Sequence, residues 1–156
     1  MSKAIDQPAQ GSAPAAAATA PAAPVADGIR VLELRIPVRW GDMDAAAHVN
    51  NTVYLRYMEE ARLAWTYALG VRNKIPGQAP ILARIECDFK RPVTWPAELL
   101  VRQTVVRTGR TSVEHAVEML QDGVLVASGR SVMVWMDYNT GQPTPWPEPQ
   151  RSMFSV

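Results

Sequence analysis

The sequence predicts an α+β domain in which an antiparallel sheet of five strands is wrapped around one long helix. Apolar and polar residues alternate with period two in several segments, which is typical of half-buried strands. One segment, residues 51–69, instead repeats its apolar residues at helical spacing. It follows the first strand and precedes four others. Because short turns join these four, we expect them to pair antiparallel.

At 156 residues the chain fits one domain. Residues 1–27 contain eleven alanines and four prolines without periodicity, which predicts a disordered tail. We therefore expect a folded domain over residues 28–140 and an irregular C-terminal tail over residues 141–156.

The net charge of +1 gives no electrostatic reason to expect a nucleic-acid or membrane partner. The single cysteine excludes an internal disulfide, and no cysteine–histidine cluster has the spacing of a zinc site. No targeting signal or membrane-spanning stretch is recognised, so we expect a cytoplasmic protein.

The first strand is predicted over residues 31–40, with Trp40 on the same apolar face as Ile36 and Val38. The helix that follows can be capped by Asn50 or Asn51 and closed by Gly70. Its apolar stripe predicts that it lies against the sheet, over about five turns.

Four further strands are predicted after the helix, at residues 81–89, 98–107, 113–119 and 124–135. The dipeptide Asp122-Gly123 indicates a tight hairpin between the last two. The last strand is nearly continuous in apolar and small residues, which predicts burial on both faces. Residues 137–150 contain four prolines and are expected to be irregular.

A polar loop lies between the first strand and the helix, and it contains Asp42, Asp44, His48, Asn50 and Asn51. An aspartate can act as a nucleophile or a general base. A helix start supplies unpaired backbone N–H groups and a partial positive charge. Polar groups gathered at such a point are placed for chemistry, although an aspartate here can also simply shape the loop as an Asx turn.

Residues 41–54 read Gly-Asp-x-Asp-x-x-x-His-Val-Asn-Asn-x-x-Tyr, and Tyr57, Glu59 and Arg62 follow on the helix. This block, within residues 30–137, resembles the hotdog-fold acyl-CoA thioesterases, most closely the 4-hydroxybenzoyl-CoA thioesterase group. The resemblance implies that Asp44 is the nucleophile or general base and that the Asn51 N–H stabilises the oxyanion. Members often carry a glycine before the histidine, where this chain has Ala47.

The remaining site candidates have supporting roles. We expect His48 to position its neighbours, Asp42 to order the loop, Asn50 to cap the helix and Tyr54 to line the pocket. Basic and hydroxyl side chains are candidates to contact coenzyme A, each with solvated surface as the simpler alternative: Lys90, Arg91, Arg107, Arg110, Thr111 and Ser112.

Four other side chains have structural interpretations. Glu59 and Arg62 are at one-turn spacing and can form an ion pair on the helix. On the strands, His115 is expected to be a hydrogen-bonded core histidine and Cys87 an inert buried thiol.

We therefore expect an acyl-CoA thioesterase, with coenzyme A as part of the substrate and no separate cofactor or metal. The acyl donor can be coenzyme A or acyl carrier protein, and the acyl group is left open. Two alternatives are a hotdog-fold hydratase of 2-enoyl-CoA and a non-catalytic acyl-CoA-binding module. Because one helix covers only part of the sheet, we also expect a homodimer or homotetramer.

Overall fold

The structure is a computed structural model that describes residues 28–71 and 75–154. The tail expected over residues 1–27 lies outside the described residues. Five long strands and one long helix make up most of the described chain. Their bounds are β1 Ile29–Pro37, α1 Asn51–Ala68, β2 Gln78–Phe89, β3 Glu98–Thr108, β4 Ser112–Gln121 and β5 Val124–Asp137.

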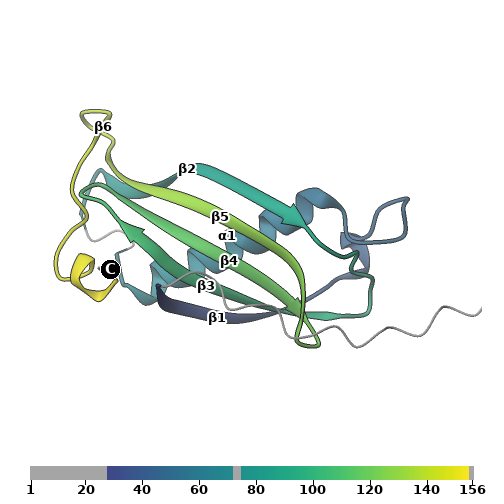
Figure 1. Ribbon diagram of the computed structural model, residues 1–156. Helices are drawn as coiled ribbons and strands as arrows, with labels where there is room; N and C mark the ends of the chain where they lie inside the picture. The colour runs from purple at the N-terminus through teal and green to yellow at the C-terminus, as the bar shows by residue number, and fades with distance from the viewer. Residues whose placement is uncertain (1–27, 72–74, 155–156) are drawn as a thin grey trace, which may run out of the picture.

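The sheet is antiparallel with the order β1-β3-β4-β5-β2, and a two-residue strand, β6 Gln142–Pro143, pairs with β5. Figure 1 shows α1 running along one face of this sheet. The expected α+β hotdog architecture is confirmed, with β6 as an addition. Strands β1 and β2 are the two outer long strands, so α1 is flanked by two sheet edges.

The inner face of the sheet and the buried stripe of α1 form two apolar clusters. The first surrounds the first half of α1 and includes Tyr54, Tyr57 and Met58. The second surrounds its last turns, where Trp65 packs against Trp146. Full burial of one large apolar side chain contributes ~1.5–3 kcal/mol, so these two clusters hold the helix on the sheet.

The C-terminal segment completes the second cluster. Trp146 is 2% exposed and Phe154 is fully buried, and both rings contact Trp65 edge-on or at a tilt. Between them lies a short 3-10 helix, Arg151–Met153. The segment expected to be an irregular tail therefore packs in the core, although most of it has no regular structure.

The tight hairpin predicted at Asp122-Gly123 is confirmed. Asp122 has φ +50° and Gly123 has φ +79°, and two successive positive φ values are the mark of a type I′ turn. Val113, His115, Val117 and Met119 all point inward, each at most 1% exposed.

Two predictions on burial are wrong. Trp40 does not continue the apolar face of β1, because the chain turns into a 3-10 helix, Trp40–Asp42, and the indole is 75% exposed. Strand β5 is not buried on both faces, because α1 covers only the inner one. Its outer residue Arg130 is exposed, whereas Ser131 on the inner face is fully buried.

Among the described residues, no helix combines the length and the apolar character that crossing a membrane requires.

Candidate active site

The polar loop between β1 and α1 is fixed by Asp42, which is 3% exposed. Its Oδ2 accepts hydrogen bonds from the Arg39 N–H at 2.8 Å and from the Tyr57 hydroxyl at 2.7 Å, and its Oδ1 pairs with Arg56. Burial raises the pKa of Asp42, but these bonds and the arginine charges outweigh it and lower the pKa. Asp42 is therefore an ionised anchor that ties the loop to the first turns of α1.

Asp44 is half-buried, and both its carboxylate oxygens are held. Oδ1 accepts from the Ala46 N–H at 2.8 Å, and Oδ2 accepts from Asn50 Nδ2 at 2.9 Å. The bond from Ala46, then that from Asn50, lowers the pKa of Asp44, and the charge of His48 lowers it further. Asp44 therefore forms an Asx turn and is also an ionised carboxylate aimed at the cap of α1, so the structural and chemical interpretations coexist.

Asn50, not Asn51, caps the helix. Its Oδ1 accepts from the Thr52 N–H at 2.9 Å and from the Thr52 hydroxyl at 2.7 Å. Asn51 is the first helical residue, and within residues 28–71 and 75–154 its N–H has no acceptor. A free donor at the positive end of a helix is suited to stabilise an anion.

Ala47 has φ +61°, a left-handed conformation that alanine adopts with strain. Its N–H donates to the Asp44 carbonyl at 3.0 Å, and the Asp44 N–H donates to the His48 carbonyl at 3.1 Å. Alanine thus occupies the backbone conformation for which the glycine of similar proteins is suited, and the tight turn from Asp44 to His48 is kept.

Two hollows adjoin this loop. A hollow of about 310 Å³ is lined by His48, Asn51, Tyr54, Lys90 and Arg91, with Val49, Phe89 and Pro92. A second, of about 550 Å³, is lined by Asp44 and Ala47 together with Trp40, Gly41, Met43 and Trp95. Within one protomer the carboxylate and the helix-start N–H therefore line neighbouring hollows, joined through Asn50.

The other coenzyme A candidates lie elsewhere. Arg107, Arg110, Thr111 and Ser112 lie at or next to the β3–β4 turn, where Trp146 N donates to the Arg110 carbonyl and packs on Trp65 near the end of α1. That end of the sheet is remote from the loop (Figure 1). The structure brings Lys90 and Arg91 to the site and leaves these four away from it, so their role stays a prediction.

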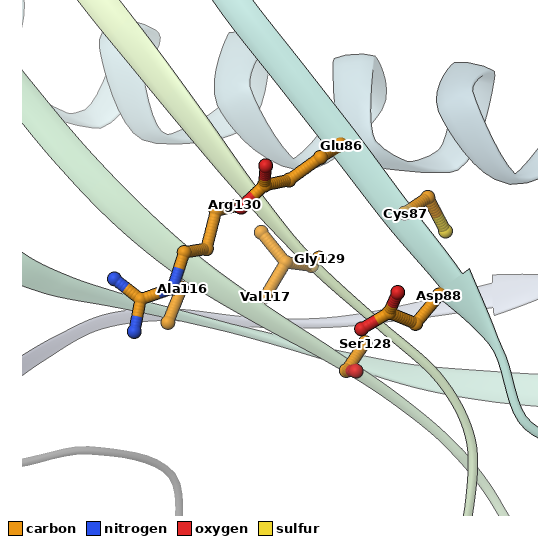
Figure 2. Close-up of a pocket in the computed structure, with 8 residues that line it drawn as sticks. All are labelled: Glu86, Cys87, Asp88, Ala116, Val117, Ser128, Gly129 and Arg130. Carbon is orange, nitrogen blue, oxygen red and sulfur yellow. The ribbon is translucent and has the colours of Figure 1, made fainter.

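A further hollow of about 480 Å³ lies on the outer face of the sheet, over β2, β4 and β5. Figure 2 shows Glu86, Asp88, Ser128 and Arg130 around the small residue Gly129. It is separated from the loop by the sheet itself. No group of three or more histidine, cysteine, aspartate or glutamate side chains in the described ranges is placed to hold a metal ion.

Sequence reasoning did not single out several residues at the site. Trp40 and Trp95 flank the Asp44 hollow, and Arg56 pairs with Asp42. Trp95 approaches the loop from a distant segment, where its N–H contacts Met43 Sδ at 3.3 Å. No spacing in the sequence signals either contact, because Trp95 and Met43, like Arg56 and Asp42, come together through tertiary packing.

One long helix wrapped by an antiparallel sheet is the hotdog architecture, and an ionised carboxylate lies beside the start of that helix. The chain belongs to the thioesterase-like superfamily, whose family model matches residues 38–154. The expected resemblance and the expected enzyme class, a thioester hydrolase, are thereby confirmed.

Solved structures are consistent with this family assignment. The PA2801 protein of Pseudomonas aeruginosa, provisionally assigned as a thioesterase, is 31% identical, with a TM-score of 0.74 over 80% of this chain and 98% of that one. A protein of Xanthomonas campestris, provisionally assigned as an acyl-CoA thioesterase, is 39% identical, with a TM-score of 0.62 over 69% and 94%.

More distant relatives share the architecture. The 1,4-dihydroxy-2-naphthoyl-CoA thioesterase Slr0204 of Synechocystis is 21% identical, with a TM-score of 0.71 over 77% of this chain and 92% of that one, a likeness of fold alone. The curated protein YsmA of Bacillus subtilis is 24% identical over 118 residues, 75% of this chain and 80% of its own length.

Proposed function

We propose that the protein hydrolyses acyl-CoA thioesters to a free carboxylic acid and coenzyme A. The observation that carries this proposal is the hydrogen bond from Asn50 Nδ2 to Asp44 Oδ2. Because Asn50 also caps α1, this bond ties an ionised carboxylate to the helix end whose first N–H is free. Acyl transfer requires that pairing of a base or nucleophile with an oxyanion donor.

In the proposed reaction, Asp44 either attacks the thioester carbonyl carbon or removes a proton from the water that attacks it. The carbonyl oxygen becomes an oxyanion and accepts a hydrogen bond from the Asn51 N–H. The carbon–sulfur bond then breaks. If Asp44 attacked, the mixed anhydride that it forms with the acyl group is hydrolysed by water, which releases the acid and restores the carboxylate, and the thiolate is protonated from solvent. If Asp44 acted as base, the acid forms directly and the proton taken from water passes to the departing thiolate. His48 lines the same hollow as Asn51 and is placed to orient groups beside the helix start.

Lys90 and Arg91 are suited to bind the phosphates of coenzyme A, because they line the hollow beside the helix start. Tyr54 forms an apolar wall of the same hollow, packing edge-on against Phe89 at 5.2 Å between ring centroids. Burial raises the pKa of Tyr54, which keeps its phenol neutral. The substrate in this proposal enters with its nucleotide on the side of these two basic residues.

We further propose a homodimer or higher homo-oligomer. Strand β2 is an outer strand with twelve residues, and the face of α1 beside it exposes Leu55, Leu63 and Tyr67. A long strand with one open edge next to exposed apolar side chains favours association with a second copy. Analytical sedimentation of the purified protein checks this proposal. The expected result is a mass above that of one 17.2 kDa chain.

The test of the proposed activity is a thiol-release screen across aromatic, short, long and 3-oxo acyl-CoAs, with the same acyl groups on acyl carrier protein in parallel. Release of free coenzyme A is the expected result. Loss of the conjugated double bond of a 2-enoyl-CoA without thiol release would identify a hydratase instead. Tight binding with neither reaction would identify a binding module.

A further inference from the structure

The polar loop before α1 is a tight hairpin whose base is closed by a backbone hydrogen bond. The Asn50 N–H donates to the Asp42 carbonyl at 2.9 Å, and further into the loop the Asp44 N–H donates to the His48 carbonyl at 3.1 Å. These bonds link the two arms of the loop. A shift of Asp42 is therefore passed to both Asp44 and Asn50.

Two contacts hold Asp42 on α1, and they differ in burial. The Tyr57 hydroxyl donates to Asp42 Oδ2 at 2.7 Å, and these residues are 1% and 3% exposed. Arg56 pairs with the other carboxylate oxygen, but its side chain is 47% exposed. Solvent weakens an exposed ion pair, whereas a buried hydrogen bond to a charged acceptor is strong. The Tyr57 hydroxyl is therefore the firmer link between the loop and the helix.

Tyr57 is suited to act as a permanent donor at this point. Burial, followed by the hydrogen bond to Asp42, raises the pKa of Tyr57, so the phenol stays protonated at neutral pH. Tyr57 lies six residues after Asn51 in α1, about 9 Å along the helix axis. In the described part of the chain it lines neither hollow beside the loop, so its hydroxyl can act on the reaction only through Asp42.

We propose that Tyr57 is a positioning residue: through Asp42, its hydroxyl holds the polar loop and the helix start in the alignment that hydrolysis requires. This inference rests on the proposed thioesterase activity. The aligned groups are the Asp44 carboxylate and the Asn51 N–H. Asn50 joins them, because its side chain contacts Asp44 and its N–H contacts the Asp42 carbonyl. A displacement of reacting groups by about 1 Å lowers a rate by up to ~10²-fold.

The test is Tyr57→Phe, which removes one oxygen atom and keeps the ring that packs edge-on against Tyr54. Octanoyl-CoA and benzoyl-CoA are the probes. We expect kcat for thiol release to fall ~10-fold or more while KM changes less than ~2-fold, because the lost contact aligns reacting groups and does not bind substrate. An undiminished kcat would overturn the proposal.

The matched control is Thr66→Val, on the same helix but far from the loop. Thr66 is 7% exposed, and its hydroxyl donates to the Leu63 carbonyl at 2.9 Å. This variant also removes one hydroxyl hydrogen bond from a buried side chain of α1, and it should leave kcat unchanged. An equal loss of kcat in both variants would overturn the proposal, because the loss would then follow helix stability.

A double-mutant cycle tests the route through Asp42. Asp42→Asn alone should lower kcat, since it removes the charged acceptor of the Tyr57 hydroxyl. Adding Tyr57→Phe to Asp42→Asn should lower kcat by no more than ~2-fold further, because the contact is already weakened. Losses that multiply fully would show that Tyr57 acts independently of Asp42, which would overturn the proposal.

Amide hydrogen exchange at Asn50 separates this inference from the proposed activity, because it needs no turnover. In Tyr57→Phe the Asn50 N–H should exchange at least ~10-fold faster than in the wild type, whereas Thr66→Val should leave its rate unchanged. If no acyl-CoA releases thiol but this difference is found, the proposed activity fails and the positioning of the loop by Tyr57 stands. An Asn50 rate that is unchanged, or raised equally by both variants, overturns the inference, whatever the thiol screen shows.

Discussion

At the start of α1, Asp42 and Asp44 each accept hydrogen bonds on both carboxylate oxygens, counting the Asp42–Arg56 ion pair. Beneath the later turns of the same helix, four buried polar side chains have atoms without partners among residues 28–71 and 75–154: Arg62, Gln103, His115 and Ser131. In the first region both carboxylates are satisfied within one protomer. The second has polar capacity that water, a ligand or a second copy must satisfy, because buried polar groups are almost always hydrogen-bonded.

This difference shows that the start of α1, and not the region beneath its later turns, is preorganised. Charges at the start of α1 are fixed before any substrate arrives, as electrostatic stabilisation of a transition state requires. The second region carries a cost in the isolated protomer that binding can offset. Variants of each region should therefore behave differently.

The largest effect is expected from removing the Asn51 N–H. Proline is tolerated at the first helical position, and Asn50 has φ −63° and ψ 141°, a conformation that a following proline accepts. Asn51→Pro should fold normally and lose ~10²–10³ in kcat. Asn51→Ala, which keeps the N–H, should retain activity. Steady-state kinetics of the two variants would contradict the oxyanion role if both were equally active.

Replacing Asp42, which anchors the loop, should lower the free energy of unfolding and not only the activity. Asp42→Ala leaves the Tyr57 hydroxyl without its acceptor and frees Arg56, at an expected cost of ~2–3 kcal/mol in the free energy of unfolding. Asp44→Ala, at a more exposed position, should cost less than ~1 kcal/mol. Urea denaturation of both variants checks the contrast, which would fail if the two losses were equal.

His115 should make the protein acid-sensitive. Its pKa is about 3 in the folded state and 6.5 in the unfolded state, so the unfolded chain binds the extra proton between these values. Stability should therefore be retained above pH 6.5 and fall by up to ~1.4 kcal/mol per pH unit as the pH drops toward 3. His115→Leu should flatten this limb, as followed by denaturation at several pH values. An unchanged slope would show that other groups govern acid unfolding.

The smallest effect concerns the strained turn. Ala47→Gly removes the Cβ at φ +61° and should stabilise the fold by ~0.5–1 kcal/mol after the entropy cost of glycine. Thermal unfolding should show a rise of a few degrees in Tm. A lower Tm would mean that the alanine methyl contributes packing that outweighs the strain.

Local patterns in the sequence were sufficient for much of the fold. The period of apolar residues predicted α1, and the dipeptide Asp122-Gly123 predicted a turn with two positive φ values. The exposure of Trp40 could not be predicted, since alternation continues past the residue where the chain leaves the sheet. Burial of β5 was overestimated because composition does not tell how many layers cover a strand.

The candidate site was predictable to the extent that it is local. Asp44, Asn50 and Asn51 lie within eight residues, so their proximity follows from the chain itself. The partners of Asp42 on α1 and the approach of Trp95 depend on tertiary packing. His115 is buried as predicted, but the prediction that it is hydrogen-bonded is wrong among the described residues, where neither ring nitrogen has a partner. A sequence pattern shows that a side chain is buried but not what it bonds to.

The most direct test of the account replaces the Asp44 carboxylate by an amide of the same shape. Asp44→Asn keeps an acceptor for the Ala46 N–H and loses the one for Asn50 Nδ2, at a partly exposed position. It should still fold, bind acyl-CoA, and lose ~10²–10⁴ in kcat for thiol release. The same substitution at the exposed Asp122 is the control and should leave kcat unchanged. Undiminished turnover by Asp44→Asn would contradict the assignment of hydrolysis to this residue.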